Sequence, residues 1–284
     1  MAGAGPKVWI SVDMEGIEGL VDRAQFMPEG REYQRSRVHM IEEMCTVVRA
    51  AWEAGASQVV VNDSHDGQIN LTYEALASLP EETVLISGTG KRLAMCEGMA
   101  GADVAFFVGY HAMAGTAHAV MDHTFTGDLY RVRLNGQEVG ECGLNAYLAG
   151  HYGIPVGLVT GDQALVDEAR TLVAGAEMVV NKVGLGRQSA RLVHPSVLGR
   201  QITEATRRAV ERAREGKLPV PLRIQTPVTV EVGFMTSQGA DMAMWLDGAE
   251  RVDGRSVAVQ CPDMERAYVA FRALVRLGTG LPLY

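Results

Sequence analysis

KVWISV, residues 7–12, is a short β-rich run that Asp13-Met14-Glu15-Gly16 ends, and it sets the pattern for the rest of the chain. Similar apolar, β-branched runs occupy residues 58–62 (QVVVN), 83–87 (TVLIS), 103–109 (DVAFFVG) and 154–160 (IPVGLVT). These runs are nearly all apolar and do not alternate with polar residues, which is typical of strands that are covered on both faces. They therefore predict the parallel strands of a buried sheet.

Helical periodicity separates these strands. Residues 32–54 carry Val38, Ile41, Cys45 and Val48 at steps of three and four, the spacing of an amphipathic helix. We expect further helices at residues 71–79, 141–152 and 195–215. Alternating buried strands and helices predict an α/β fold, with a mostly parallel open sheet flanked by helices.

The later part of the chain follows a different pattern. Residues 129–139 alternate and contain Asn135-Gly136, a strong hairpin signal. Residues 217–227 carry three prolines and predict a linker, after which strands at 228–232 and 256–260 precede a helix capped by Asp263. We therefore predict an α/β catalytic domain over residues 1–216. A smaller α+β lobe, for oligomerisation or pocket closure, is expected over 217–284.

Composition excludes several classes of protein. Of 284 residues, 47% are hydrophobic, which is too many for a disordered chain. With 26 Lys and Arg against 34 Asp and Glu, the net charge of −8 argues against binding to nucleic acid or to an anionic membrane. No apolar run approaches the length of a membrane span, and four scattered cysteines predict reduced thiols. We expect a cytoplasmic protein.

Polar side chains follow three of the predicted strands directly. Asp13 and Glu15 follow the first strand, His65 the second and His111 the fourth, so that all should meet at the carboxyl edge of the sheet. Glu141 lies between glycines at the start of a predicted helix and is a fifth candidate. Imidazole and carboxylate together suit Zn²⁺, and Mn²⁺ or Fe²⁺ with less preference.

Charge favours two metal ions over one. Asp13, Glu15 and Glu141 bring three negative charges, which two divalent ions and a bridging hydroxide would neutralise. A centre of this kind activates a water molecule for hydrolysis. Taken singly, Asp13 and Glu15 could instead be turn residues. His123 lies in a segment, residues 109–125, that is rich in Gly, Ala and His. It is either a general acid, base or transition-state stabiliser, or a residue that only holds a ligand.

Four motifs in order resemble the M55 family of metallopeptidases, from Val8 to about Gln260. They are SVDMEG (11–16), VNDSH (61–65), GYH (109–111) and GECGLNAY (140–147). The resemblance implies two zinc ions held at Asp13, Glu15, His65, His111 and Glu141, and a catalytic histidine at His123. Where the family has Ser-His, this sequence has Asp122-His123, and an adjacent carboxylate makes an imidazole more basic.

The resemblance also implies an activity and an assembly. We expect a zinc-dependent aminopeptidase of the D-aminopeptidase type, which hydrolyses the first peptide bond of short peptides through a water activated by two metals. The family implies a ring-shaped homo-oligomer, a decamer. Two alternatives stay open: a two-metal hydrolase of another class, acting on phosphoesters or other amides, and a non-catalytic peptide-binding relative. A phosphoesterase would need positioned basic residues, for which Arg92, Arg131 and Arg133 are candidates.

Overall fold

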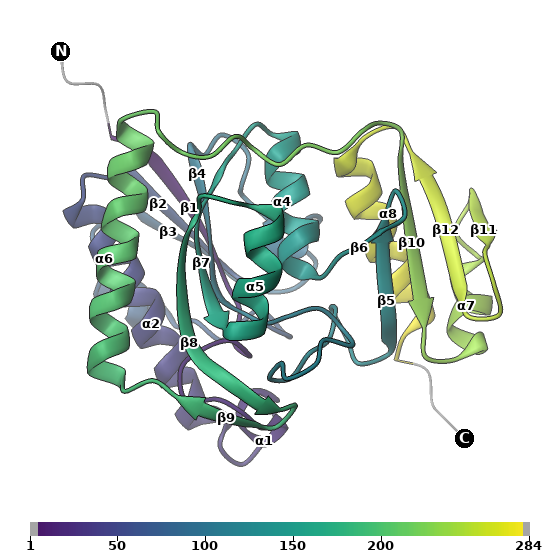
Figure 1. The fold of residues 1–284 in the computed structure, drawn as a ribbon, viewed down its shortest axis with the longest axis horizontal. Helices are drawn as coiled ribbons and strands as arrows, with labels where there is room; N and C mark the ends of the chain where they lie inside the picture. Colours follow the sequence, from purple (N-terminus) through teal and green to yellow (C-terminus); the bar gives the residue numbers. More distant parts are fainter. Residues whose placement is uncertain (1–4, 281–284) are drawn as a thin grey trace.

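The predicted first strand, β1, lies inside the larger of two sheets (Figure 1). The structure is a computed structural model and describes residues 5–280. The larger sheet has the strand order β3-β2-β1-β4-β7-β8-β9, and only β9 runs antiparallel to its neighbour. Its strands are β1 (Lys7–Val12), β2 (Gln58–Asp63), β3 (Thr83–Ile86), β4 (Val104–Tyr110), β7 (Val156–Asp162), β8 (Glu177–Gly186) and β9 (Ser189–Leu192). The predicted mostly parallel α/β sheet is therefore confirmed.

Helices cover both faces of this sheet. α2 (Tyr33–Glu53) and α6 (Pro195–Arg214) pack together on one face, and α4 (Glu141–His151) and α5 (Gln163–Leu172) cover the other (Figure 1). The short α1 (Arg23–Phe26), α3 (Tyr73–Ala77) and the 3₁₀ turn η1 (Ala94–Cys96) lie in the connections. The sandwich of helix, sheet and helix explains why the strands are apolar throughout.

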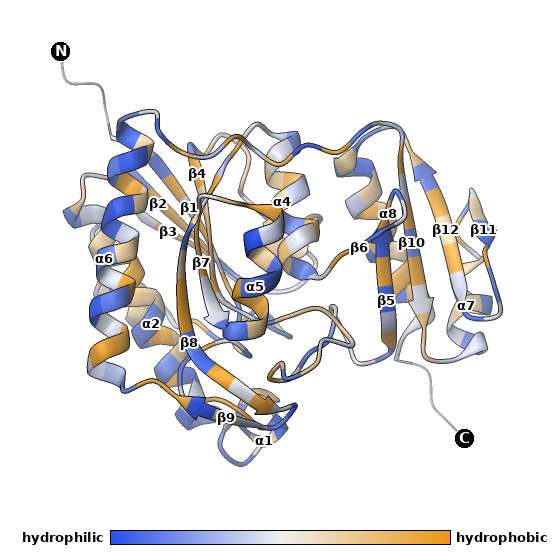
Figure 2. Ribbon diagram, in the orientation of Figure 1, coloured by the Kyte–Doolittle hydropathy of each residue, from blue (hydrophilic) through white to orange (hydrophobic). Residues whose placement is uncertain are grey.

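β1 shows this burial on both faces. Val8 and Ile10 lie in the core beneath α2 and α6, whereas Trp9 points into the core on the opposite face. All three are at most 1% exposed. In Figure 2 the strands of this sheet are largely hydrophobic, whereas α6 carries hydrophilic residues on its outer side. Because both faces of β1 pack in apolar cores, KVWISV does not alternate between apolar and polar residues.

A second, antiparallel sheet has the order β11-β12-β10-β5-β6. Its strands are β5 (Leu129–Leu134), β6 (Gln137–Glu138), β10 (Val228–Phe234), β11 (Ala249–Arg251) and β12 (Ser256–Cys261). α8 (Met264–Gly278) packs on this sheet and on α4, and the shorter α7 (Ser237–Ala243) packs against α8. The predicted hairpin is β5–β6, and both Asn135 and Gly136 have positive φ, at 49° and 83°.

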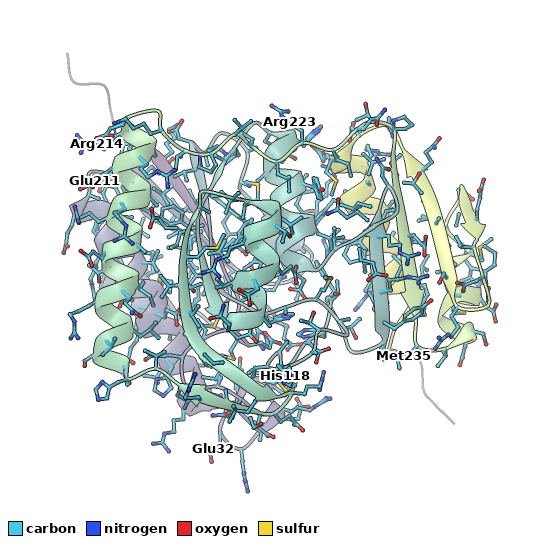
Figure 3. The ribbon with its side chains drawn as sticks, viewed as in Figure 1. Glu32, His118, Glu211, Arg214, Arg223 and Met235 are labelled. Carbon is cyan, nitrogen blue, oxygen red and sulfur yellow. The ribbon has the colours of Figure 1, made fainter. Side chains whose placement is uncertain are left out.

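The second sheet combines distant parts of the chain. Val132 of β5 pairs with Val232 of β10, so that two of the five strands come from within residues 1–216. The predicted lobe at 217–284 supplies the other three strands and α7 and α8. A long connection with Arg223 links α6 to β10, as Figure 3 shows, and it includes the predicted proline-rich linker. The hairpin signal predicted a turn but could not identify the strand beside it, because pairing between distant strands depends on tertiary packing.

Three further observations bear on the sequence predictions. β8, β9, α5 and α7 were not expected from the sequence. None of the helices that the structure describes is both long and apolar enough to cross a membrane. All four cysteines are free and buried, in agreement with the predicted thiols.

Candidate metal centre

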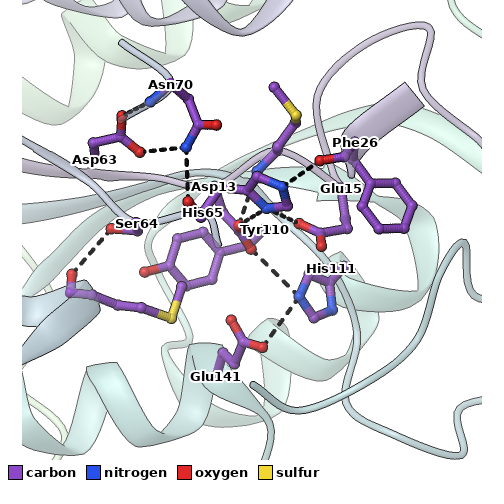
Figure 4. Close-up of polar contacts among 12 residues, drawn as sticks. Asp13, Glu15, Phe26, Asp63, Ser64, His65, Asn70, Tyr110, His111 and Glu141 are labelled. Atoms are coloured by element: carbon purple, nitrogen blue, oxygen red, sulfur yellow. Dashed lines mark hydrogen bonds and ion pairs between the residues drawn. The ribbon is translucent and has the colours of Figure 1, made fainter. Parts of the chain in front are cut away.

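The predicted metal ligands meet at the carboxyl edge of three neighbouring strands. β2, β1 and β4 lie side by side, and His65, Asp13 and His111 follow their last residues by one or two positions. Glu141 begins α4 and reaches the same place from the opposite side (Figure 4). The strand-end argument therefore placed these side chains correctly.

Two glycines allow the loops that carry these ligands to approach each other. The Gly16 amide donates to the Gly109 carbonyl oxygen at 2.8 Å. A Cβ at position 16 would lie 1.8 Å from the Tyr110 carbonyl oxygen, and Gly109 has a positive φ of 70°. Both positions exclude a side chain, so the glycines of the SVDMEG and GYH motifs bring Glu15 and His111 together.

Asp13 lies between two groups of ligands. Its Oδ1 is 3.4 Å from His65 Nδ1, and that nitrogen is also 3.0 Å from Glu15 Oε2. Its Oδ2 is 3.4 Å from His111 Nε2, which is 3.3 Å from Glu141 Oε1. Each oxygen of Asp13 thus faces a separate cluster of one imidazole and one further carboxylate.

His123 closes the arrangement into a ring. Its Nε2 lies 3.6 Å from Glu15 Oε1 and 3.8 Å from Glu141 Oε1. The His123 ring also stacks on His111, with centroids 4.0 Å apart and planes 8° apart. Three imidazoles and three carboxylates therefore alternate around a common centre.

Backbone carbonyl groups set the orientation of all three imidazoles. A carbonyl oxygen can only accept a hydrogen bond, so the ring nitrogen facing it carries a proton, and when the ring is neutral the other nitrogen has the free lone pair. The bonds are His65 Nε2 to Phe26 O at 2.8 Å, His111 Nδ1 to Ala112 O at 3.1 Å, and His123 Nδ1 to Met121 O at 2.8 Å. Each neutral ring is thus in the tautomer that suits a metal ligand.

Two buried atoms support a metal at this place. Asp13 Oδ2 and His111 Nε2 have no hydrogen-bond partner among the described residues, although both are buried and face each other. Buried polar atoms normally have partners, so this pair fits coordination of a cation. The three donor clusters that converge here are Asp13/Glu15/His65, Asp13/His111/Glu141 and Glu15/His111/His123. Carboxylate and imidazole donors of this kind fit zinc.

Burial and mutual charge govern the titration of the site. Burial lowers the pKa of His65, but the carboxylates of Glu15 and Asp13 outweigh it and raise the pKa well above its ordinary value. Glu141 and Asp13 do the same for the pKa of His111. Burial and the Glu15 carboxylate raise the pKa of Asp13. The imidazoles of His65 and His111 therefore hold protons that a cation at this place would displace.

The centre opens into a cavity of about 430 Å³. His123 lines this cavity and its side chain is 18% exposed, whereas the His111 side chain is 1% exposed and lies behind it. Two basic residues, Arg23 and Arg187, also line it. The basic residues proposed from the sequence lie elsewhere: Arg92 pairs with Glu265, and Arg131 and Arg133 lie beside Glu231.

The Asp122 carboxylate contacts the backbone and Arg187, and among the described residues it forms no hydrogen bond or ion pair with the His123 ring. One Asp122 oxygen accepts from the Gly115 amide at 2.7 Å, and the other accepts from Arg187 Nε at 3.0 Å. The Met121 amide donates to Arg187 O at 2.8 Å. The Asp-His pair of the sequence thus anchors the loop that carries His123.

Several supporting residues were not identified from the sequence. Asn70 donates to His65 O at 2.7 Å and to Asp63 Oδ1 at 2.8 Å, so Asp63, the last residue of β2, holds the loop that follows this strand. The Phe125 amide donates to Glu141 Oε1 at 2.6 Å. No sequence motif predicts these supporting hydrogen bonds, because they join residues that only folding brings together.

The sequence model of the M55 peptidase family, described as D-aminopeptidase, matches residues 7–273. The chain belongs to the M55 family. An M55 relative, the D-aminopeptidase of Bacillus subtilis (strain 168), is 36% identical over 274 residues, covering 95% of this chain and 97% of the relative. A similar solved structure is described as the Zn-dependent D-aminopeptidase DppA from Bacillus subtilis, a self-compartmentalizing protease. It has a TM-score of 0.90 and 34% identity, and the match covers 97% of this chain and 100% of DppA.

Membership of the M55 family confirms the predicted enzyme class, a metallo-aminopeptidase of the D-aminopeptidase type. The match with DppA also confirms the predicted fold. It spans both sheets, so this M55 chain and DppA share the architecture that brings the six polar side chains together.

Proposed function

We propose that this protein is a zinc aminopeptidase that binds two zinc ions per chain and removes the N-terminal residue, a D-amino acid, from short peptides. The observation that best supports this proposal is the position of Asp13, whose two oxygens face two separate imidazole–carboxylate clusters. Asp13 could therefore serve as a ligand in both clusters. His65 and Glu15 would complete one cluster, and His111 and Glu141 the other.

Zinc is the metal that the donors favour. Histidine nitrogens and carboxylate oxygens are its ordinary ligands, and catalytic sites leave a position open to substrate. The similar DppA is described as Zn-dependent. Bound zinc supplies a Lewis acid for the peptide carbonyl and makes water nucleophilic near neutral pH.

His123 is the proposed catalytic residue. Its Nδ1 is held by Met121 O, which leaves Nε2 on the cavity side between Glu15 and Glu141. A protonated Nε2 can donate to the developing oxyanion or to the leaving amine. The stacked His111 ring and the Asp122–Arg187 contact hold the imidazole and its loop in place.

The cavity supports a peptide substrate of limited length. Its volume of about 430 Å³ suits a few residues. Phe26, Met27 and Met121 give it apolar walls, while Arg23 and Arg187 could pair with a peptide carboxylate. The D-preference rests on the relatives, which are described as D-aminopeptidases.

Metal analysis paired with hydrolysis of matched D-alanyl and L-alanyl peptides tests this proposal. About two zinc per chain, and chelator-sensitive cleavage of the D-peptide, are expected. A chromogenic phosphodiester provides the comparison with another hydrolase class. Two zinc with phosphodiester cleavage and no peptide cleavage would contradict the proposed substrate, and a protein that binds no metal would contradict the whole proposal.

Single substitutions separate the two metal positions. Glu15→Gln should weaken the site built with His65, and Glu141→Gln the site built with His111, so each should retain one zinc. His123→Gln should retain both ions but lose kcat, because it removes the proton donor. Exposed Glu81→Gln is the charge-matched control. If His123→Gln released a metal ion and kept the kcat of the remaining loaded enzyme, His123 would be a ligand instead.

We also propose that the chain forms a ring-shaped homo-oligomer, a decamer, in the cytoplasm. DppA is described as self-compartmentalizing, and Met235, Trp245 and Val252 of the second sheet and its loops are exposed apolar residues that an interface could cover. The lobe at 217–284 would then serve assembly or pocket closure. Light scattering after gel filtration should give a particle mass ten times that of the chain. Four free cysteines support the cytoplasmic location.

A further inference from the structure

A buried lysine, Lys182 of β8, contacts the loop that carries Glu15. The Lys182 side chain has 0% exposure. Its Nζ donates to Glu15 O at 2.6 Å, to Ile17 O at 2.8 Å and to Leu20 O at 2.6 Å. No carboxylate oxygen of the described residues lies within 4.0 Å of Nζ. All three donors of the ammonium group are therefore used on one short segment, residues 15–20.

Two further buried side chains contact the same segment. Asn181, next to Lys182, donates from Nδ2 to Gly16 O at 3.1 Å and to Glu43 Oε1 at 2.9 Å. Glu43 of α2 in turn accepts from the Glu18 amide at 3.3 Å. We call Lys182, Asn181 and Glu43 the loop clamp. It joins β8 and α2 to the loop that leaves β1.

The loop requires such contacts because it is largely buried and has no regular structure. Glu15, Gly16, Ile17 and Leu20 are all buried. Their carbonyl groups cannot pair in a sheet there, and a buried carbonyl without a partner is unfavourable. Lys182 satisfies three of them at once.

Lysine suits this position because its ammonium group supplies three donors to buried carbonyl groups, and these hydrogen bonds offset part of the cost of burying its charge. What an apolar residue could not do is fix three carbonyl groups, one of them on Glu15 itself. The lysine is therefore suited to holding the backbone that orients the Glu15 carboxylate.

We infer that the loop clamp is a positioning device for the metal centre, and that Lys182 is a positioning residue for the reaction. This rests on the proposed function, because Glu15 acts as a ligand there. Lys182 touches neither the cavity nor the reacting atoms. It acts through the backbone of residues 15–20, and its removal should loosen one donor cluster, Asp13/Glu15/His65.

Zinc affinity, measured by competition with a chelating dye, tests the inference. Lys182→Met keeps the aliphatic volume and removes all three hydrogen bonds. It should lower the affinity of one of the two ions by about 10- to 100-fold, as is usual for residues that hold ligands. Asn181→Ala removes one bond to the loop and should give a smaller loss. Val179→Ala, in the same strand and in the α2/α6 core, is the matched control and should leave zinc affinity unchanged.

Hydrogen exchange of the zinc-free protein gives a second readout. The amides of residues 16–20 should exchange faster in Lys182→Met than in Val179→Ala at equal global stability. If Lys182→Met does not fold, Asn181→Ala decides the outcome by the same two measurements. If both clamp variants bound zinc as tightly as the wild type, the inference would be overturned and the proposed function would stand. If the wild-type protein bound no zinc, both the inference and the proposed function would be overturned.

Discussion

Each oxygen of Asp13 faces a different imidazole, and each imidazole lies between two carboxylates. Carbonyl groups behind the rings decide which nitrogen faces inward. At the residue scale, the chemistry of the site therefore depends on backbone atoms as much as on the ligands themselves. Zinc requires imidazoles without a proton on the inner nitrogen, and this makes its binding sensitive to pH.

Zinc should stabilise this protein more at pH 8 than at pH 6. Without metal, the folded protein holds the protons of His65 and His111 more tightly than the unfolded chain does, because folding raises the pKa of both imidazoles. This stabilisation is complete below pH 6.5, the pKa in the unfolded chain, and is lost as the pH rises toward the pKa in the folded protein. Zinc binding displaces those protons, so its affinity rises with pH. The difference in melting temperature between zinc-loaded and chelator-treated protein, measured by differential scanning fluorimetry, should grow from pH 6 to pH 8. A difference that stayed constant or became smaller would contradict this assignment of the protons.

At the element scale, α8 supports the site from the second sheet. Phe271 is fully buried, and its ring meets Phe125 edge to face with centroids 4.9 Å apart. The Phe125 amide holds Glu141, so the packing of α8 reaches a proposed ligand in two steps. Tyr268 of α8 also donates to Asn145 Oδ1 at 2.9 Å, and Asn145 donates to Tyr110 Oη at 2.8 Å, next to His111.

Phe271→Ala should therefore reduce both stability and activity. The cavity left by a buried phenylalanine costs about 3–5 kcal/mol, and the Phe125 segment would lose its support. Urea unfolding measures the first effect and kcat on a D-alanyl peptide the second. Val269→Ala on the same helix, only partly buried, is the control and should change both far less. A destabilised Phe271→Ala variant that kept the wild-type kcat would show that this packing does not support the site.

At the scale of the whole molecule, the two sheets depend on each other. β5 pairs with β10 across nearly one hundred residues of sequence, and a single apolar core extends from Trp9 in the first sheet to Val232 and Phe271. The predicted division at residues 216 and 217 cuts this sheet between β5 and β10. Residues 217–284 therefore form a separate stretch of sequence, but in the fold they share one sheet and one apolar core with residues 1–216.

A fragment of residues 1–216 should consequently fail to fold on its own. It would keep the β5–β6 hairpin without its partner strand, and an isolated two-stranded hairpin is marginal in water. It would also expose the apolar face that α8 and β10 cover. Gel filtration with dye binding to exposed apolar surface should show aggregation or a loosely packed state. A monodisperse fragment with cooperative unfolding would establish residues 1–216 as an independent domain.

The sequence by itself determined the parallel sheet and the edge at which the ligands meet. Strands covered on both faces must be apolar throughout, as KVWISV is, and residues after parallel strands must share one edge. Asp13, His65 and His111 could therefore be predicted from periodicity and position. These signals are local, since each depends on residues adjacent in the chain.

Only the tertiary structure decided which strands and side chains contact one another. The pairing of β5 with β10, the carbonyl groups that orient the imidazoles, the contact of Asp122 with Arg187, and the three bonds of Lys182 all join segments that are separate in sequence. Strand pairing and buried hydrogen bonds are selected by the packing of the whole chain, and no local pattern records them. The residues proposed to bear the chemistry could thus be selected from the sequence, whereas the residues that hold them in place required the fold.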